Sequence, residues 1–179
     1  MRVVFWAMLL LFAAPLMAAE YNGFELAPDH STLVLHSATG DVRAPRVGDQ
    51  QGFDAPRLSP DGRMAGWLAL ERACCESYPL PTSLVLFRNG RIVRRFGDGL
   101  VISSWAFADG GNAVAYSQGT AHSATSTLYV LRRVADGRLL AKFACKLNAG
   151  APPARPMQSG GRGKMPAWVW PIAEDCPIR

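Results

Sequence analysis

Short apolar runs separated by turn residues recur along this chain and predict β-strands rather than helices. The run at residues 64–70 has the length of a strand that is buried on both faces. The runs at 84–87 and 92–96 flank the Asn-Gly pair at 89–90, which is typical of a two-residue hairpin between antiparallel strands. Nothing downstream of the N-terminal apolar run needs a helix to explain its pattern. The sequence therefore predicts an all-β protein.

The same strand-turn-strand unit occurs twice at nearly constant spacing. The first copy starts at the Ser-Pro-Asp-Gly turn at residues 59–62 and ends at Phe96, and the second starts at the Asp-Gly turn at 109–110 and ends at Phe143. Residues 21–41 repeat the pattern in shortened form. Such repeats are typical of propeller blades, and a closed propeller needs at least about four of them. We therefore expect two or three tandem antiparallel β-meander blades in a propeller-like but incomplete array.

The start of the chain has the pattern of a secretory signal peptide. Arg2 precedes an apolar run at residues 3–14, and the segment that follows ends in the small residues Ala18 and Ala19, which suit cleavage after Ala19. A retained membrane anchor is the alternative, although the apolar stretch is shorter than the ~20 residues that a bilayer span needs. We expect a periplasmic or secreted protein with no stable membrane insertion after cleavage. Its expected parts are a signal peptide (1–19), a propeller-like β domain (20–148), and a Pro/Gly-rich linker with a C-terminal tail that packs on the domain (149–179).

The chain is mildly basic, with a formal net charge of +5. In an exported protein this charge favours contact with an envelope protein or an anionic polymer. The basic residues are scattered rather than gathered with aromatic residues on one face, so we do not expect nucleic-acid binding. Seven of them lie in matching hairpins, where they form either a basic stripe for an anionic polymer or a solvated outer edge that resists aggregation: Arg91, Arg94, Arg95, Arg132, Arg133, Arg138 and Lys142.

Four cysteines, an even number in an oxidising compartment, predict two disulfides. One pairing joins Cys145 to Cys176 and leaves Cys74 with Cys75 as a strained vicinal bridge. The other joins Cys74 and Cys75 each to a distant cysteine, and the sequence does not decide between the two. We do not expect a zinc site, because adjacent thiolates fit two corners of one tetrahedron poorly and the chain has no C-x-x-C motif or nearby histidine pair.

Two long loops occupy equivalent places in the two copies, at residues 71–82 and 118–126. Equivalent loops of neighbouring blades emerge at one end of the array, so this end is the expected functional face. The tail adds two tryptophans that we expect to pack against the body of the protein, either as an edge cover or as an aromatic binding patch. The candidate binding residues are Glu76, Ser77, Tyr78, His122, Trp168 and Trp170.

Residues with catalytic chemistry do not form a recognisable set. The chain has no G-x-S-x-G motif for a serine nucleophile. His122 and Ser123 are neighbours in a loop, where adjacent side chains point apart, so they make a poor base and nucleophile. We therefore expect no catalytic residues, no bound metal and no cofactor.

The motifs resemble those of bacterial TolB-type, WD-repeat-like β-propeller units. The Ser-Pro-Asp-Gly turn at 59–62 matches fully, and the turn at 108–110 with Leu128-Tyr129 and Gly137 matches in part. The resemblance covers about residues 55–143 and implies a propeller-like fold. The segment at 74–79 is also similar to a C-C-x-S-Y-P loop in a group of small exported bacterial proteins of unknown function, which implies no activity.

These patterns predict an exported, non-catalytic binding module that contacts a protein or an envelope polymer through loops 71–82 and 118–126. Two alternatives stay open. One is a redox-responsive protein centred on Cys74 and Cys75. The other is a structural subunit that completes a propeller by self-assembly, as a homo-oligomer.

Overall fold

The computed structural model is all-β and describes residues 20–72, 77–121, 126–146 and 165–173. Its strands form three antiparallel sheets, in each of which chain neighbours pair, and none of the described sheets closes into a barrel. The all-β fold and the incomplete array of meander blades are thus confirmed. The first blade holds β1 (Tyr21–Leu26), β2 (Leu33–Ser37) and β3 (Val42–Arg43); the second β4 (Gly52–Leu58), β5 (Ala65–Glu71), β6 (Leu80–Arg88) and β7 (Arg91–Phe96); the third β8 (Val101–Ala108), β9 (Ala113–Gly119), β10 (Ser126–Arg133) and β11 (Leu139–Lys146).

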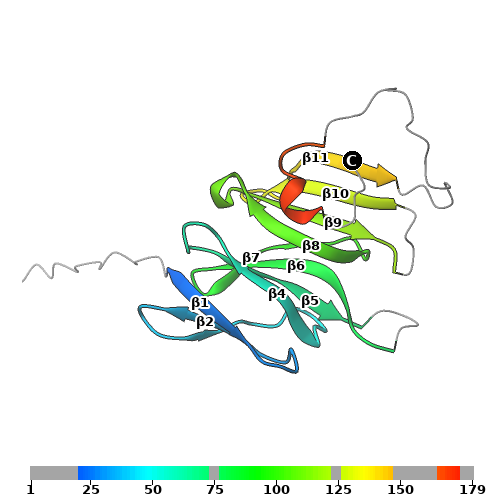
Figure 1. Cartoon of the computed structure of the whole chain (residues 1–179). Coiled ribbons are helices and arrows are strands. Elements are labelled where there is room, and N and C mark those ends of the chain that lie inside the picture. Colours follow the sequence, from blue (N-terminus) through cyan, green and yellow to red (C-terminus); the bar gives the residue numbers. More distant parts are fainter. Residues whose placement is uncertain (1–19, 73–76, 122–125, 147–164, 174–179) are drawn as a thin grey trace, which may run out of the picture.

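The three blades stack in chain order (Figure 1). Two short 3₁₀ turns accompany them, η1 (Asp109–Gly111) between β8 and β9, and η2 (Trp170–Ile172) in the C-terminal segment. Across the residues described, no helix is long and apolar enough to span a bilayer. The predicted signal peptide and its cleavage site after Ala19 lie outside the described residues, as do Cys74, Cys75, Glu76, His122 and Cys176.

Local turn chemistry sets the blade hairpins. Asn89 and Gly90 have positive φ values of 52° and 74°, the backbone that a two-residue hairpin with the right-handed strand twist requires. The predicted hairpin between β6 and β7 is therefore confirmed. In the turn before β5, the Ser59 hydroxyl donates to Asp61 Oδ1 (2.6 Å) and accepts from the Met64 N–H (2.9 Å). These side-chain bonds hold the chain reversal that the sequence predicted at residues 59–62.

The first interface lies between the first and second blades. The Trp67 ring lies 5.7 Å from the Phe53 ring and 6.0 Å from the Phe87 ring, centroid to centroid, and all three side chains are buried. Alternate residues of β5 serve different interfaces, because Trp67 packs here while Leu68 packs against the third blade. The prediction that this strand is buried on both faces is thus confirmed, since β5 lies in the middle blade of the stack.

The second interface lies between the second and third blades and is organised around Trp105 of β8. The indole is fully buried, and its Nε1 donates to the carbonyl of Ala55 in β4 (2.8 Å). Its ring reaches the backbone of β5 at Gly66, where the Cβ of any larger residue would lie only 2.6 Å from Trp105 Cη2. Leu86 and Val114 complete the contact from either side. The residue without a side chain thus makes room for the largest one.

A C-terminal segment, residues 165–173, covers the outer face of the third blade. Val169 and Ile172 are buried there against Tyr129 of β10, and Figure 1 shows the red turn η2 lying on this sheet. Trp168 packs partly against the same cluster, but Trp170 is 61% exposed, so the prediction that both tryptophans pack inward is wrong for Trp170. The smaller side chains of Val169 and Ile172 cover this face instead. The face on which a further blade would stack is therefore already occupied.

Candidate functional site

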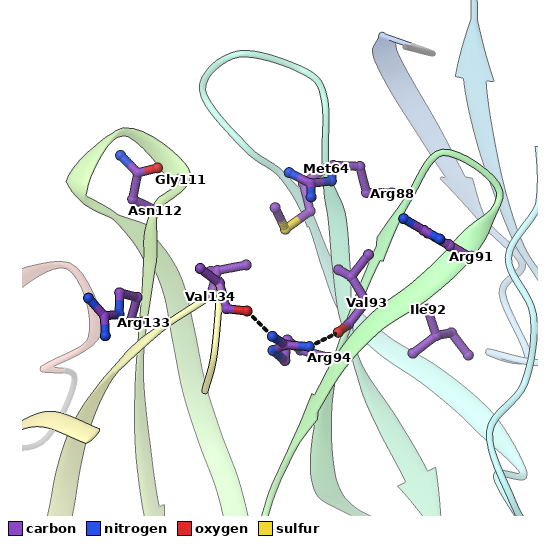
Figure 2. Close-up of a pocket in the computed structure, with 11 residues that line it drawn as sticks. Met64, Arg88, Arg91, Ile92, Val93, Arg94, Gly111, Asn112, Arg133 and Val134 are labelled. Atoms are coloured by element: carbon purple, nitrogen blue, oxygen red, sulfur yellow. Dashed lines mark hydrogen bonds between the residues drawn. The ribbon is translucent and has the colours of Figure 1, made fainter. Parts of the chain in front are cut away.

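A cleft of about 550 Å³ lies at the junction of the second and third blades. The β6–β7 hairpin forms one wall, and the β8–β9 turn with the end of β10 and the turn after it forms the other (Figure 2). Its apolar lining comes from Met64, Ile92, Val93 and Val134, of which Met64 and Val134 are buried in the interface core. Its polar lining is dominated by the arginines Arg88, Arg91, Arg94 and Arg133.

Arg94 joins the two walls of the cleft. Its Nη1 donates to the carbonyl of Val93 (2.8 Å), and its Nη2 donates across the blade interface to the carbonyl of Ala135. Figure 2 shows this guanidinium in the middle of the site, with both bonds dashed. Its Nε is buried and finds no hydrogen-bond partner within the described part of the chain. Carbonyls hold the group in place without neutralising it, so the site keeps a fixed positive charge.

Arg88 and Arg91 add two further charges at the tip of the hairpin. They lie directly opposite each other in the ladder between β6 and β7, and both are exposed. Neither makes an ion pair with any residue that the structure describes. Like charges placed directly across a ladder destabilise it, so this pair has an electrostatic cost for the fold. A negatively charged ligand between the blades would relieve that cost.

Arg133 differs from the other arginines because it has a carboxylate partner. Its Nη2 lies 2.6 Å from Asp136 Oδ2, and its Nε donates to Oδ1 at 3.0 Å. These bonds, together with the Arg138 N–H, lower the pKa of Asp136 to about 2. Asp136 is therefore ionised at neutral pH and offsets the charge of Arg133. The uncompensated charge of the cleft lies on Arg88, Arg91 and Arg94.

A second, more open cleft of about 480 Å³ adjoins the first and shares Arg94 with it. Arg132 lines this second cleft, where its Nε donates to the Tyr116 hydroxyl (3.0 Å) and its Nη1 to the carbonyl of Gly137 (3.0 Å). Burial raises the pKa of Tyr116, so the phenol stays neutral and leaves the charge of Arg132 uncompensated. Arg95 also lines this cleft, but it forms an ion pair with Glu71 (2.6 Å).

The structure brings together most of the basic residues that the sequence placed in matching hairpins. Five of those seven line one or both clefts, whereas Arg138 and Lys142 line neither. Sequence reasoning missed Arg88, although its position directly before the Asn-Gly turn predicts that it faces Arg91 across the hairpin. It also missed the clefts themselves, which need two blades to meet.

The two long loops emerge at the end of the blades opposite to the β6–β7 hairpin and the first cleft. One follows β5 and the other follows β9, and the strand ladders place both sets of loop stems at the end where β7 passes into β8. At that end the Gln118 side-chain amide donates to Asp98 Oδ2 (3.1 Å). Of the candidate binding residues in these loops, Tyr78 is 51% exposed and Ser77 is exposed. The first cleft and the loops are thus separate surfaces, whereas the second cleft reaches the loop end through Arg95 and Gly97.

Cys145 lies on β11 and is buried beneath the C-terminal segment, in the same cluster as Met165 and Val169 of that segment. The other three cysteines lie outside the described residues, so the two alternative disulfide pairings stay predictions.

Comparison with protein families and with curated proteins places this chain in no known class. No protein-family model matches it, and no curated protein matches it significantly. Its function is therefore inferred from the geometry of the clefts.

Proposed function

We propose that this chain is an exported, non-catalytic binding module that holds an anionic ligand in the cleft between its second and third blades. The observation that carries the proposal is the convergence of Arg88, Arg91 and Arg94 on one cleft without a carboxylate partner in the described part of the chain. Export is supported by the signal-peptide pattern of residues 1–19. An anionic envelope polymer is the ligand that such a location would present.

The chemistry of the cleft favours an oxyanion over a neutral ligand. A guanidinium offers several N–H donors in a planar fork that matches the oxygens of a phosphate or a carboxylate. Arg94 is already oriented by two carbonyls, so an incoming anion does not have to order this side chain. Val93 and Val134 give the cleft apolar walls beside Arg94, and apolar surroundings strengthen the interaction of a charged group with an anion.

Removing the two exposed charges of the cleft should weaken binding of a short anion. We expect the double variant Arg88→Ala/Arg91→Ala to bind inorganic tripolyphosphate about tenfold more weakly than the unaltered protein, because each exposed charge contact contributes up to about 1 kcal/mol. Isothermal titration calorimetry at low ionic strength measures this change.

The matched control removes two arginines from the first blade. Arg43 and Arg46 are exposed, and within the described part of the chain their side chains bond only to Thr32 and to the carbonyl of Ser31, far along the chain from the cleft. The variant Arg43→Ala/Arg46→Ala lowers the net charge by the same amount and should keep the affinity. Equal affinities for all three proteins, or equal losses in both variants, would contradict the proposed site.

Protein binding at the loop end is a second candidate function, and a specific network favours it. The Glu71 carboxylate at the end of β5 accepts bonds from Arg95 (2.6 Å), from the Ser83 hydroxyl (3.0 Å) and from the Thr82 hydroxyl. This network ties together the two stems of the loop at residues 71–82 and supports the exposed Tyr78 between them. Completion of a ring by self-assembly is less favoured, because residues 165–173 occupy the outer face of the third blade.

A further inference from the structure

We infer that the anionic ligand is a linear polyanion that runs along β7 and occupies both clefts, with Arg94 at their junction. This inference rests on the proposed function, since it specifies the ligand of the same site. It adds that a single small anion fills only part of the site. The chemistry in question is a chain that carries anionic oxygen groups at intervals, of phosphate or of carboxylate.

The arrangement of the arginines carries the inference. Six arginines but a single aspartate line the two clefts, which meet at Arg94. Among the arginines without a carboxylate partner in the described part of the chain, Arg91 lines the first cleft only, Arg94 lines both, and Arg132 of β10 lines the second only. Arg95 also lines the second cleft, but the Glu71 carboxylate compensates its charge. One small anion seated in the first cleft leaves the charge of Arg132 in the second cleft without a partner, whereas a chain of linked anions can contact both clefts.

The second cleft offers its own uncompensated charge. Arg132 is held by the Tyr116 hydroxyl and the Gly137 carbonyl, and its Cζ lies 6.0 Å from the centroid of the Phe96 ring. It makes no ion pair with any of the described carboxylates. Arg94 and Arg132 thus resemble each other in having neutral partners that fix the guanidinium and leave its charge available. A polyanion would contact Arg91 and Arg88 first, then Arg94, then Arg132.

The test compares a short with a long anion in a variant of the second cleft. We expect Arg132→Gln to leave the affinity for tripolyphosphate within about twofold, because this ligand is held in the first cleft. The same variant should lower the affinity for a long-chain inorganic polyphosphate, which spans both clefts, by about fivefold or more. The slope of log affinity against log salt for the long chain should fall by roughly one. The variant Arg132→Lys keeps the charge, so it should restore most of the affinity for the long chain and most of the salt dependence.

The outcomes separate this inference from the proposed function. If Arg132→Gln weakens binding of the long-chain polyphosphate but not of tripolyphosphate, the result supports a polyanion site that extends over both clefts. Titration with a poly-glutamate of similar length then shows whether carboxylate chains bind there as well. If tripolyphosphate binding depends on Arg88 and Arg91 but Arg132→Gln binds both chain lengths normally, the extended polyanion site is wrong. The proposed anion site in the first cleft then still stands. If the unaltered protein binds neither tripolyphosphate, nor long-chain polyphosphate, nor poly-glutamate, both the proposed function and this inference are wrong. Thermal unfolding of each variant checks that the blades remain folded.

Discussion

Replacing Trp105 with alanine should lower the free energy of unfolding by about 4 kcal/mol, which corresponds to a fall of roughly 10 °C in the melting temperature. The indole is 0% exposed and packs between the second and third blades, where no rearrangement of the strands can close the resulting cavity cheaply. The change also leaves the Ala55 carbonyl without the Nε1 donor. Urea denaturation followed by tyrosine and residual tryptophan fluorescence measures the loss.

The substitution Trp105→Phe is the matched control. It keeps an aromatic ring in the interface, where the neighbouring Phe107 ring lies 5.2 Å away, and removes the indole N–H. We expect it to cost about 2 kcal/mol, less than the alanine variant, because the cavity is smaller while the Ala55 carbonyl still loses its donor. A Trp105→Ala variant as stable as the unaltered protein would contradict the description of the second and third blades as one packed unit.

Replacing Gly97 with alanine should cost about 3 kcal/mol, the second large effect. Gly97 has a φ of +141°, in the region that L-residues avoid, and a Cβ added there would lie 2.2 Å from the carbonyl oxygen of Thr82. Because the clash is with backbone, no side-chain rotation relieves it, and either β6 or the connection to β8 must shift. Thermal unfolding and urea midpoints measure the effect.

Gly99 in the same connection provides the comparison for this prediction. It also has a positive φ, +87°, but an added Cβ meets nothing within 4 Å. Gly99→Ala should therefore cost only the backbone preference, about 1 kcal/mol. If the two variants are equally stable, the close contact between Gly97 and Thr82 is not present in the folded protein.

Local signals predicted the strands and turns well. The Asn-Gly pair at 89–90 requires positive φ at both positions, and the Ser-Pro-Asp-Gly turn at 59–62 supplies its own hydrogen bonds, so each can be predicted from a few adjacent residues. The apolar run of β5 predicted burial on both faces for the same reason, because its composition alone excludes a solvated face. The blade repeat followed from the order of these elements.

Contacts between blades could not be predicted in the same way. The bond from Arg94 to the Ala135 carbonyl joins residues 41 positions apart, and the cleft exists only because two hairpins of different blades meet. The sequence therefore directed attention to the long loops, which stand out by length, rather than to arginines that resemble an ordinary solvated edge. Trp170 shows the same limit, since nothing local indicated that Val169 and Ile172 would fill the space beneath the tail.

The most direct test of the anion site observes the arginine side chains themselves. NMR spectra of the arginine Nε–H groups, recorded during titration with tripolyphosphate, report which guanidinium groups contact the ligand. Our account predicts that the signals of Arg88, Arg91 and Arg94, which line the first cleft, shift during the titration. Those of Arg43 and Arg46 in the first blade should stay in place. Shifts spread equally over all exposed arginines, or no shift at Arg94, would contradict a binding site between the second and third blades.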